Sequence, residues 1–354
     1  DLATSQWIRD NAGGTFALNG TSRLILGNNQ SIPSPSSGNG IVVPGSNFPG
    51  GFTTNTISSN STIEYDGADG ITQTVYNGVT YGNLVLTSET GVNTANKITT
   101  GAVTVTNSTT VNGYTKFTLG GNFTSNGAMS VENGAEVDAS TYTIGGSGSF
   151  TLKSGSTLDI GSLQGITSSG ATGNIQTTTR SFSTGANYVY VSTAGAGVTG
   201  NGLPTTMNNL TINNASGVTL FAGSTTYTVS GTLRLTSGAF VINGNNLAVN
   251  NVVRTSGTFS SNANSSLTIS GTNVPLYFTA GFRFIKNLTL NTNATASLGS
   301  DLDVVGGSSF GTVSIGSGAT LTTNNRLTLR SNATGTARVA EIPSNPSTGT
   351  ALGF

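Results

Sequence analysis

The stretch YGNLVL at residues 81–86 decides the fold, because the same phrase returns twice along the chain. Its counterparts are MNNLTI at 207–212 and IKNLTL at 285–290. Each phrase is followed by a polar turn and another short alternating strand, and repetition of this kind is typical of extended β-architectures stacked from similar units. We expect structural roles for the Asn-Leu pairs that the phrases share: Asn83, Leu84, Asn209, Leu210, Asn287 and Leu288.

Short strands with a two-residue period fill most of the chain. Examples are AVTVT at 102–106, SFTL at 149–152 and SLTI at 266–269, in which apolar residues alternate with hydroxyl side chains. A period of two places the apolar set on one face of a strand. Asn-Gly and Ser-Gly pairs between the strands provide the positive φ of tight turns. Apart from one short turn near residues 4–11, no amphipathic helix is predicted.

Two architectures fit brief strands separated by such turns: a β-solenoid and a set of tandem β-sandwich modules. The apolar pairs recur densely enough for coils of roughly 20–25 residues with several short faces. This spacing favours an all-β, right-handed β-helix-like solenoid, with the sandwich modules as the alternative.

The composition excludes several classes of protein. The 354 residues include 50 glycines and only 7% charged residues, and the formal net charge is zero. Disorder normally accompanies high charge and few β-branched residues, so the low charge argues against it. Nucleic acid requires clustered Lys and Arg, and the densest basic group is only Arg326, Arg330 and Arg338. A net charge near zero permits self-association.

The chain contains no cysteine and no histidine. Disulfide scaffolds, thiolate chemistry and Ser-His-Asp triads are therefore excluded. No apolar run approaches the ~18 residues of a membrane-spanning helix, so no membrane insertion is predicted. The opening residues DLAT do not form a signal peptide and are typical of a mature or trimmed N-terminus. The Thr, Ser, Asn and Gly-rich surface predicts an extracellular protein.

Proline and glycine mark the expected domain boundaries. Four prolines fall among Gly and Ser in residues 28–57, which predicts a loop, because proline cannot donate to a strand ladder. Residues 1–27 then form an N-terminal arm with the first strands. The solenoid repeats occupy 58–341, in sections of about 58–183, 184–273 and 274–341, and residues 342–354 form a linker.

The segment RLTLRSNATGTARVA at 326–340 resembles the closing strands of modules in large surface proteins of Bacteroidota. The phrases around Asn83, Asn209 and Asn287 are similar to the same modules, and the resemblance spans roughly residues 60–342. That family includes gliding-type adhesins and other products of the type 9 secretion system. The resemblance implies an exported, structural or adhesive protein of the cell surface, and it implies no catalytic residues. The family's C-terminal sorting domain is not found in this sequence.

Three carboxylates form the closest candidate for catalysis. Glu132, Glu136 and Asp138 share one face of an extended chain, where they could bind Ca²⁺ or act on a glycosidic bond. The alternative is a solvated charged edge that discourages unwanted strand pairing, and we favour it. No catalytic residue and no enzymatic activity are therefore predicted.

Two short Asp-containing segments are candidates for metal binding. They contain Asp66 and Asp69, and Asp301 and Asp303. Neither has the ligand count of an established calcium loop, and turn formation explains both, so no cofactor is predicted.

Aromatic residues have three possible roles: core packing, capping, or stacking on sugars. Core packing is favoured for the phenylalanines, which include Phe278, Phe282 and Phe284. Trp7 and Ile8 form a large apolar pair outside the repeats. We expect this pair to insert into a neighbouring copy of the chain.

These observations predict a structural subunit of an extracellular filament, or the shaft of a cell-surface adhesin, that assembles end to end into a homopolymer by β-stacking. Surface glycans are a second class of partner. The alternatives are a polysaccharide-binding or polysaccharide-cleaving β-helix protein and, third, the shaft of a phage-type fibre.

Overall fold

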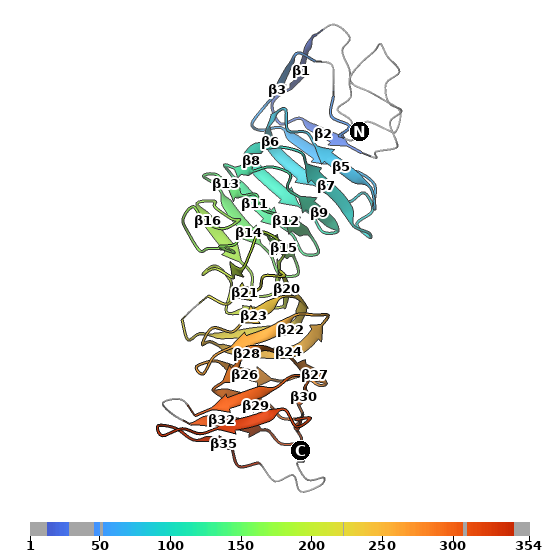
Figure 1. Ribbon diagram of the computed structural model, residues 1–354. Helices are drawn as coiled ribbons and strands as arrows, with labels where there is room; N and C mark the ends of the chain where they lie inside the picture. The colour runs from blue at the N-terminus through green and yellow to red at the C-terminus, as the bar shows by residue number, and fades with distance from the viewer. Residues whose placement is uncertain (1–12, 28–45, 50–51, 222, 307–309, 343–354) are drawn as a thin grey trace. The chain divides into compact units, whose positions relative to one another are not determined.

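The computed structural model describes residues 13–27, 46–49, 52–221, 223–306 and 310–342. Every regular element in these ranges is a β-strand, and the strands stack in parallel as a β-solenoid (Figure 1). The predicted solenoid is confirmed, and the alternative of sandwich modules is wrong. The described ranges contain no helix of a length and apolarity that could cross a membrane. The chain divides near residue 187 into two compact units, which are described in turn.

The first unit consists of residues 1–162 and 166–186 and contains two main sheets. A short pair, β1 (Thr15–Leu18) and β3 (Thr54–Ile57), lies beside them. The first sheet contains β2 (Arg23–Leu26), β4 (Thr62–Tyr65), β6 (Thr80–Leu86), β8 (Val103–Val111), β10 (Phe123–Ser125), β11 (Ala128–Val131), β13 (Ile144–Gly145), β14 (Ser149–Leu152) and β16 (Thr179–Phe182). The second contains β5 (Thr72–Val75), β7 (Ala95–Thr99), β9 (Thr115–Thr118), β12 (Glu136–Asp138) and β15 (Thr157–Ile160).

The second unit consists of residues 163–165 and 187–354 and presents three sheet faces. The first face contains β17 (Asn187–Tyr190), β19 (Thr206–Met207), β20 (Asn209–Asn213), β22 (Thr226–Ser237), β24 (Asn246–Arg254), β26 (Ser266–Ile269), β29 (Asn287–Leu290), β32 (Gly311–Ile315) and β35 (Ala337–Val339). The second contains β18 (Gly197–Val198), β21 (Val218–Thr219), β23 (Ala239–Val241), β25 (Thr258–Ser261), β28 (Phe278–Ile285), β31 (Leu302–Val305) and β34 (Leu327–Arg330). The third contains β27 (Val274–Leu276), β30 (Thr295–Leu298) and β33 (Thr320–Thr322).

Neighbouring coils pair residues that lie 20 to 25 positions apart in most registers. Leu84 on β6 lies beside Ile63 on β4 and Thr109 on β8. Leu288 on β29 lies beside Leu267 on β26 and Val313 on β32. The phrases at 207–212 and 285–290 therefore supply strands β20 and β29 of one sheet, whereas the phrase at 81–86 forms β6 in a different sheet, so the three phrases stack in parallel ladders without occupying one equivalent position.

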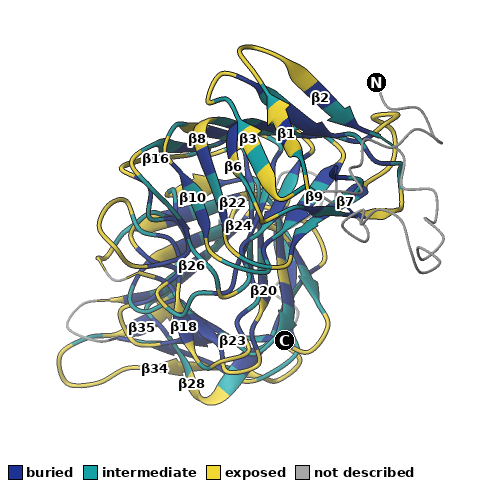
Figure 2. Ribbon diagram, turned by 90° about the horizontal axis from the view of Figure 1, so that it is seen from above, coloured by how far each residue is buried: buried dark blue, intermediate teal, exposed yellow. Residues whose placement is uncertain are grey.

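Alternate residues of most strands fill the core between the sheets (Figure 2). In the three repeated phrases the side chains that are almost completely buried are Tyr81, Leu84, Leu86, Met207, Leu210, Ile212, Ile285, Leu288 and Leu290. The second half of each phrase keeps the predicted period of two, whereas the first two buried residues are three positions apart; in the phrase at 81–86 this step coincides with a register shift between Tyr81 and Asn83. A register shift of one residue would exchange the two faces, so burial of one face fixes the register.

Close stacking of the coils explains particular glycines. A Cβ atom at Gly127 would lie 1.4 Å from the carbonyl oxygen of Asn107 in the previous coil, so no larger residue fits there. Asn243 and Gly244 both have positive φ, of 56° and 74°, as the Asn-Gly turn signal predicts.

The predicted loop at 28–57 needs correction at its C-terminal end. Residues 54–57 form β3, which pairs in parallel with β1. Phe48 is also fully buried, and its ring packs against Phe16 and Tyr76. Apolar side chains between the prolines therefore join the core. Residues 28–45 and 50–51 lie outside the described residues, as do the linker from 343 onward and the expected assembly pair Trp7 and Ile8.

The expected sections also differ from the units. The first section was expected to end at residue 183, close to the observed division, whereas the sections 184–273 and 274–341 belong to one unit. Strands β1 and β2, from the expected N-terminal arm, pair with β3 and β4 of the first unit.

Candidate functional site

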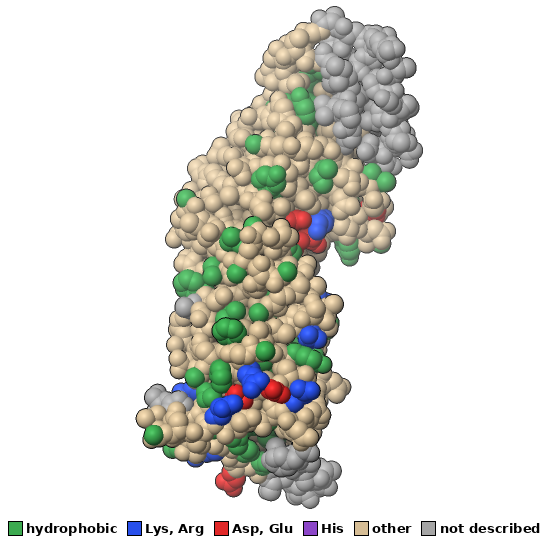
Figure 3. All heavy atoms as spheres, viewed as in Figure 1, with side chains coloured by type: hydrophobic (Ala, Val, Ile, Leu, Met, Phe, Trp, Pro, Cys, Tyr) green, Lys and Arg blue, Asp and Glu red, His purple; other side chains and the backbone are tan. Residues whose placement is uncertain are grey.

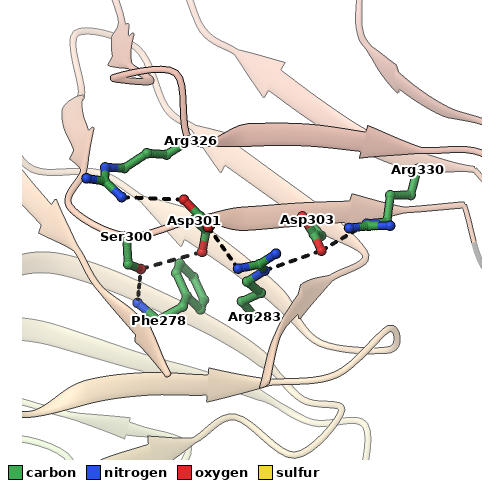
Figure 4. Close-up of polar contacts among 7 residues, drawn as sticks. All are labelled: Phe278, Arg283, Ser300, Asp301, Asp303, Arg326 and Arg330. Atoms are coloured by element: carbon green, nitrogen blue, oxygen red, sulfur yellow. Dashed lines mark hydrogen bonds and ion pairs between the residues drawn. The ribbon is translucent and has the colours of Figure 1, made fainter. Parts of the chain in front are cut away.

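The outer face of the second unit carries a cluster of three arginines and two aspartates, which we call the arginine cluster: Arg283, Asp301, Asp303, Arg326 and Arg330 (Figure 4). Its members come from three adjacent parallel strands or their ends, β28, β31 and β34. Parallel stacking thus assembles residues from three coils that lie far apart in sequence. Charged side chains of both signs gather on this face of the molecule (Figure 3).

Asp303 forms the centre of the arginine cluster. Its Oδ2 atom accepts hydrogen bonds from Nε of Arg330 at 2.9 Å and from Nε of Arg283 at 3.4 Å. The side chain is only 1% exposed, although it points away from the core row formed by Leu302 and Val304. Two guanidinium groups therefore shield this carboxylate from water. Its Oδ1 atom has no hydrogen-bond partner among the described residues.

Asp301 forms the outer part of the same cluster and is 50% exposed. It accepts from Arg283 at 2.9 Å and pairs with Arg326 at 3.4 Å. Asp301 and Asp303 are predicted candidates for metal binding. Both carboxylates pair with guanidinium groups, which take the place that a metal cation would occupy. No group of three or more Asp or Glu residues with metal-site geometry occurs in the part of the chain that the structure describes.

Aromatic side chains lie near the arginines of this unit. Phe282 precedes Arg283 on β28 and is 60% exposed, so the expectation that it packs in the core is wrong for this residue. Phe278 on the same strand is buried, as expected. The guanidinium of Arg338 lies 4.5 Å from the ring centroid of Phe310, and that of Arg254 lies 4.0 Å from the ring centroid of Tyr277.

A second charged cluster lies on the sheet of β9, β12 and β15 in the first unit. Lys116 forms an ion pair with Glu136, and its Nζ atom lies 3.9 Å from Asp138 and 3.6 Å from Asp159. The strand register places Lys116 beside Glu136, and Asp138 beside Asp159. Three carboxylates therefore share a single cation.

The carboxylates of this cluster perturb one another. Burial, followed by repulsion from Glu136, raises the pKa of Asp159 to about 7. Burial alone would lower the pKa of Lys116, but bonding to Glu136 outweighs it and raises that pKa. A carboxyl group that titrates near neutral pH can exchange a proton, which makes this cluster a candidate for acid–base chemistry.

The predicted trio of carboxylates is only partly assembled. Glu132 follows β11 in the other sheet, where it accepts hydrogen bonds from Lys153 at 2.7 Å and from Ser130 at 2.8 Å. The hydrogen bond from Lys153 lowers the pKa of Glu132. Glu136 and Asp138 do lie together, but their companions are Lys116 and Asp159, which the sequence analysis missed. Lys116 and Glu136, like Asp138 and Asp159, are about 20 residues apart in sequence. This spacing equals the offset between neighbouring coils, and it is the pattern from which the contacts could be predicted.

Asp66 and Asp69, the other two candidates for metal binding, have different surroundings. Asp69 accepts from the hydroxyls of Ser88 and Thr90 and, at 3.2 Å, from the backbone N–H of Asn93, and these bonds lower its pKa. Burial raises the pKa of Asp66. Loop contacts therefore account for Asp69, in agreement with the turn interpretation.

A buried cation lies inside the first unit. Lys97 is completely buried, and its Nζ donates to Oε1 of Gln73 at 3.0 Å and to the carbonyl of Gly67 at 3.4 Å. Gln73 also accepts from the N–H of Gly67 and donates to the carbonyl of Leu26. Burial lowers the pKa of Lys97 to about 8. No motif or spacing in the sequence indicates this buried lysine.

The asparagines of the repeated phrases bond to adjacent coils. Asn83 accepts from Asn107 at 2.8 Å, and Asn209 donates to Asn187 at 2.8 Å. Asn287 donates to Ser266 at 3.2 Å. All three are half-buried, so they strengthen the contact between coils from its outer side.

Comparison of the chain with protein-family models, with curated proteins and with solved structures finds no match. The assignment of a function therefore depends on the geometry described above.

Proposed function

We propose that this protein is a structural subunit of an extracellular filament, or the shaft of a surface adhesin, and that it assembles end to end by β-stacking. The observation that carries this proposal is the strand pairing in the last described coil. Its strands β33, β34 and β35 each pair on one side only among the described residues, with β30, β31 and β32. Among the described residues the outer edges of these three neighbouring strands are therefore unpaired, and an unpaired edge can accept a strand of another chain.

The core row of the solenoid supports the same proposal. Leu329 on β34 is in register with Val304 on β31. Val304 is fully buried, whereas Leu329 is 39% exposed, because no described strand covers it. Another β-layer placed on this edge would bury Leu329 and continue the apolar row.

The distribution of charge favours contact between unlike ends of two copies. Residues 1–186 contain ten acidic and six basic residues, whereas residues 187–354 contain three acidic and seven basic residues. Opposite net charges attract when the C-terminal part of one copy approaches the N-terminal part of another. A head-to-tail contact that does not close produces a fibre.

Electron microscopy and sedimentation of the purified protein test this proposal. We expect filaments that lengthen with protein concentration and that shorten at high salt, where charge attraction is screened. Leu329→Lys should block assembly by placing a charge in the apolar row. Thr328→Lys is the matched control, since Thr328 is exposed on the same strand. A wild-type protein that stays monomeric at all concentrations would contradict the proposal.

A separate variant tests the expected role of Trp7 and Ile8. Deletion of residues 1–12 should reduce assembly if this apolar pair inserts into the next copy. Unchanged assembly would show that Trp7 and Ile8 have no role in it, and the proposal of assembly by β-stacking would still stand.

A second candidate function is cleavage of a polysaccharide, and the observation that favours it is the pair of Glu136 and Asp159 beside Lys116. A carboxyl group whose pKa is raised to about 7 beside a second carboxyl group is a pattern found in acid–base pairs. The test is turnover of an acidic polysaccharide such as polygalacturonate, with and without calcium. Loss of turnover in Glu136→Ala would support an enzyme, and no turnover by the wild type would exclude this substrate.

A further inference from the structure

We propose that the outer face of β28, β31 and β34 binds an acidic polysaccharide, a chain of sugars that carry carboxylate or sulfate groups. The arginine cluster lies on this face (Figure 4), and β28 also carries the exposed Phe282. The inference adds a ligand to the proposed shaft, and it uses a side face of the coils rather than their ends. Binding and assembly can therefore be measured separately.

The positive charges of the arginine cluster outnumber its negative charges. Asp301 and Asp303 hold three guanidinium groups in place, and one positive charge remains in excess. Arg326 and Arg330 are 45% and 52% exposed. The bonds described for them involve one nitrogen each, NH1 of Arg326 and Nε of Arg330. Their other N–H groups are available to donate to an anion, and guanidinium groups favour carboxylate and related oxyanions.

The two most exposed guanidinium groups of the arginine cluster are spread along one strand. Arg326 immediately precedes β34 and Arg330 ends it, and four residues of extended chain span about 13 Å. Arg326 pairs with Asp301, whereas Arg330 pairs with Asp303. An extended polymer that lies along β34 would meet both arginines, whereas a small anion could contact only one of them.

An exposed aromatic ring, that of Phe282, favours sugars as the repeating unit of this polymer. The pairing of β28 with β25 is irregular between Phe259 and Ser261, and Gly281 has a φ of 80°. This bulge lifts residues 280–282 out of the sheet and leaves them exposed. Phe282 is thereby 60% exposed and directly precedes Arg283 on β28. An exposed aromatic ring on the strand that supplies an arginine suits a sugar that has an apolar C–H face and an acidic substituent.

The charge of the second unit agrees with this ligand. Residues 187–354 contain seven basic and three acidic residues, so an acidic polymer approaches an attractive field. The arginines are too few and too closely paired with aspartates to form the long basic surface that a nucleic acid requires.

The test measures binding to polygalacturonate and to dextran sulfate by affinity electrophoresis, with neutral dextran as the negative control. We expect both acidic polymers to retard the protein and neutral dextran to leave it unaffected. The double variant Arg326→Gln/Arg330→Gln should weaken binding about tenfold or more, since two charge-assisted contacts are lost. The matched control is Arg234→Gln, because Arg234 is exposed on β22 in the first sheet face of the same unit.

Phe282→Ala separates sugar recognition from simple charge attraction. This variant should weaken binding to polygalacturonate. Its affinity for inorganic polyphosphate, which has no sugar ring, should equal that of the wild type. The variant removes an exposed ring, so it should leave the melting temperature unchanged. The same series in the Leu329→Lys background keeps the protein from assembling, so a failure of filament formation does not affect the result.

Several outcomes would overturn the inference. They are the absence of binding to both acidic polymers, an equal loss of binding in Arg234→Gln, and single-stranded DNA binding more tightly than polygalacturonate. The last result would assign the face to nucleic acid instead.

Discussion

Nζ of Lys97 lies 3.0 Å from Oε1 of Gln73, and neither side chain is exposed to solvent. The Nζ atom of Lys97 donates to two oxygen atoms, Oε1 of Gln73 and the carbonyl oxygen of Gly67. Burial opposes its positive charge and lowers its pKa to about 8. An unfolded chain restores the ordinary value of about 10.4.

The first prediction is that the contribution of Lys97 to stability, measured as the difference between the wild type and Lys97→Met, rises between pH 8 and about pH 10.4. Within this window the unfolded state binds more protons at Lys97 than the folded state does, so raising the pH favours folding. The gain across the full window is up to about 3 kcal/mol.

Urea unfolding at pH 7.5 and pH 10 would measure this gain. Lys97→Met should abolish the rise and should be more stable than the wild type at pH 7.5. Lys153→Met removes a half-exposed lysine and should retain the rise. An identical pH dependence in the wild type and in Lys97→Met would contradict the prediction.

The second prediction concerns Asp159, whose pKa is raised to about 7 by burial and by Glu136. The folded state binds the proton more tightly than the unfolded state, for which the pKa is about 3.9. The stabilisation from this proton is therefore complete below about pH 4 and is lost as the pH rises through 7. Asp159→Asn should be more stable than the wild type at pH 8, by about 1–3 kcal/mol, and the difference should shrink at pH 5.

Thermal unfolding at the two pH values checks this expectation. Glu132→Gln is a suitable control, because Glu132 has a lowered pKa and should show the opposite trend. A constant difference between Asp159→Asn and the wild type would indicate that Asp159 stays ionised in the folded protein.

The third prediction compares the two aspartates of the arginine cluster. Asp303→Asn removes the buried charge that pairs with Arg283 and Arg330, and it should destabilise the second unit by about 3 kcal/mol. Asp301→Asn changes an exposed residue in the same network and should change stability by less than about 1 kcal/mol. Chemical denaturation distinguishes the two, and equal effects would show that burial of Asp303 has no energetic role.

The fourth prediction concerns the repeated phrase. Leu288→Ala leaves a cavity between Leu267 and Val313 in the core row and should destabilise the protein by about 2–5 kcal/mol. Thr289→Ala, at the next and outward-facing position, should change the stability by less than about 1 kcal/mol. The same denaturation measurement applies, and a similar loss in both variants would contradict the assignment of faces.

The sequence determines the coil architecture clearly because the signals are local. Alternation of apolar and hydroxyl residues specifies the strands, and the three similar phrases reveal the stacking. The coil offset places Leu84, Leu210 and Leu288 in the core without further information.

The charged clusters were harder to predict because their members meet across coils. Glu132 and Glu136 share a face in an isolated extended chain, but a turn between them sends each to a different sheet. Asp159 joins Glu136 only through the register of β12 with β15. The exposure of Phe282 follows from an irregular pairing that no sequence pattern signals. Prediction of such sites requires the register between strands of neighbouring coils, and the alternation of residues within one strand does not specify that register.

The register of the coils has a consequence for how such a chain can change in length. Met129 lies beside Phe150, and Ser130 beside Thr151. Excision of residues 130–150 would join Met129 directly to Thr151 and leave the inward and outward alternation intact. Tandem duplication of the same interval would add a whole layer. Evolution can therefore adjust the length of this protein in discrete steps of one layer, while the alternation of inward and outward side chains is kept in every remaining layer.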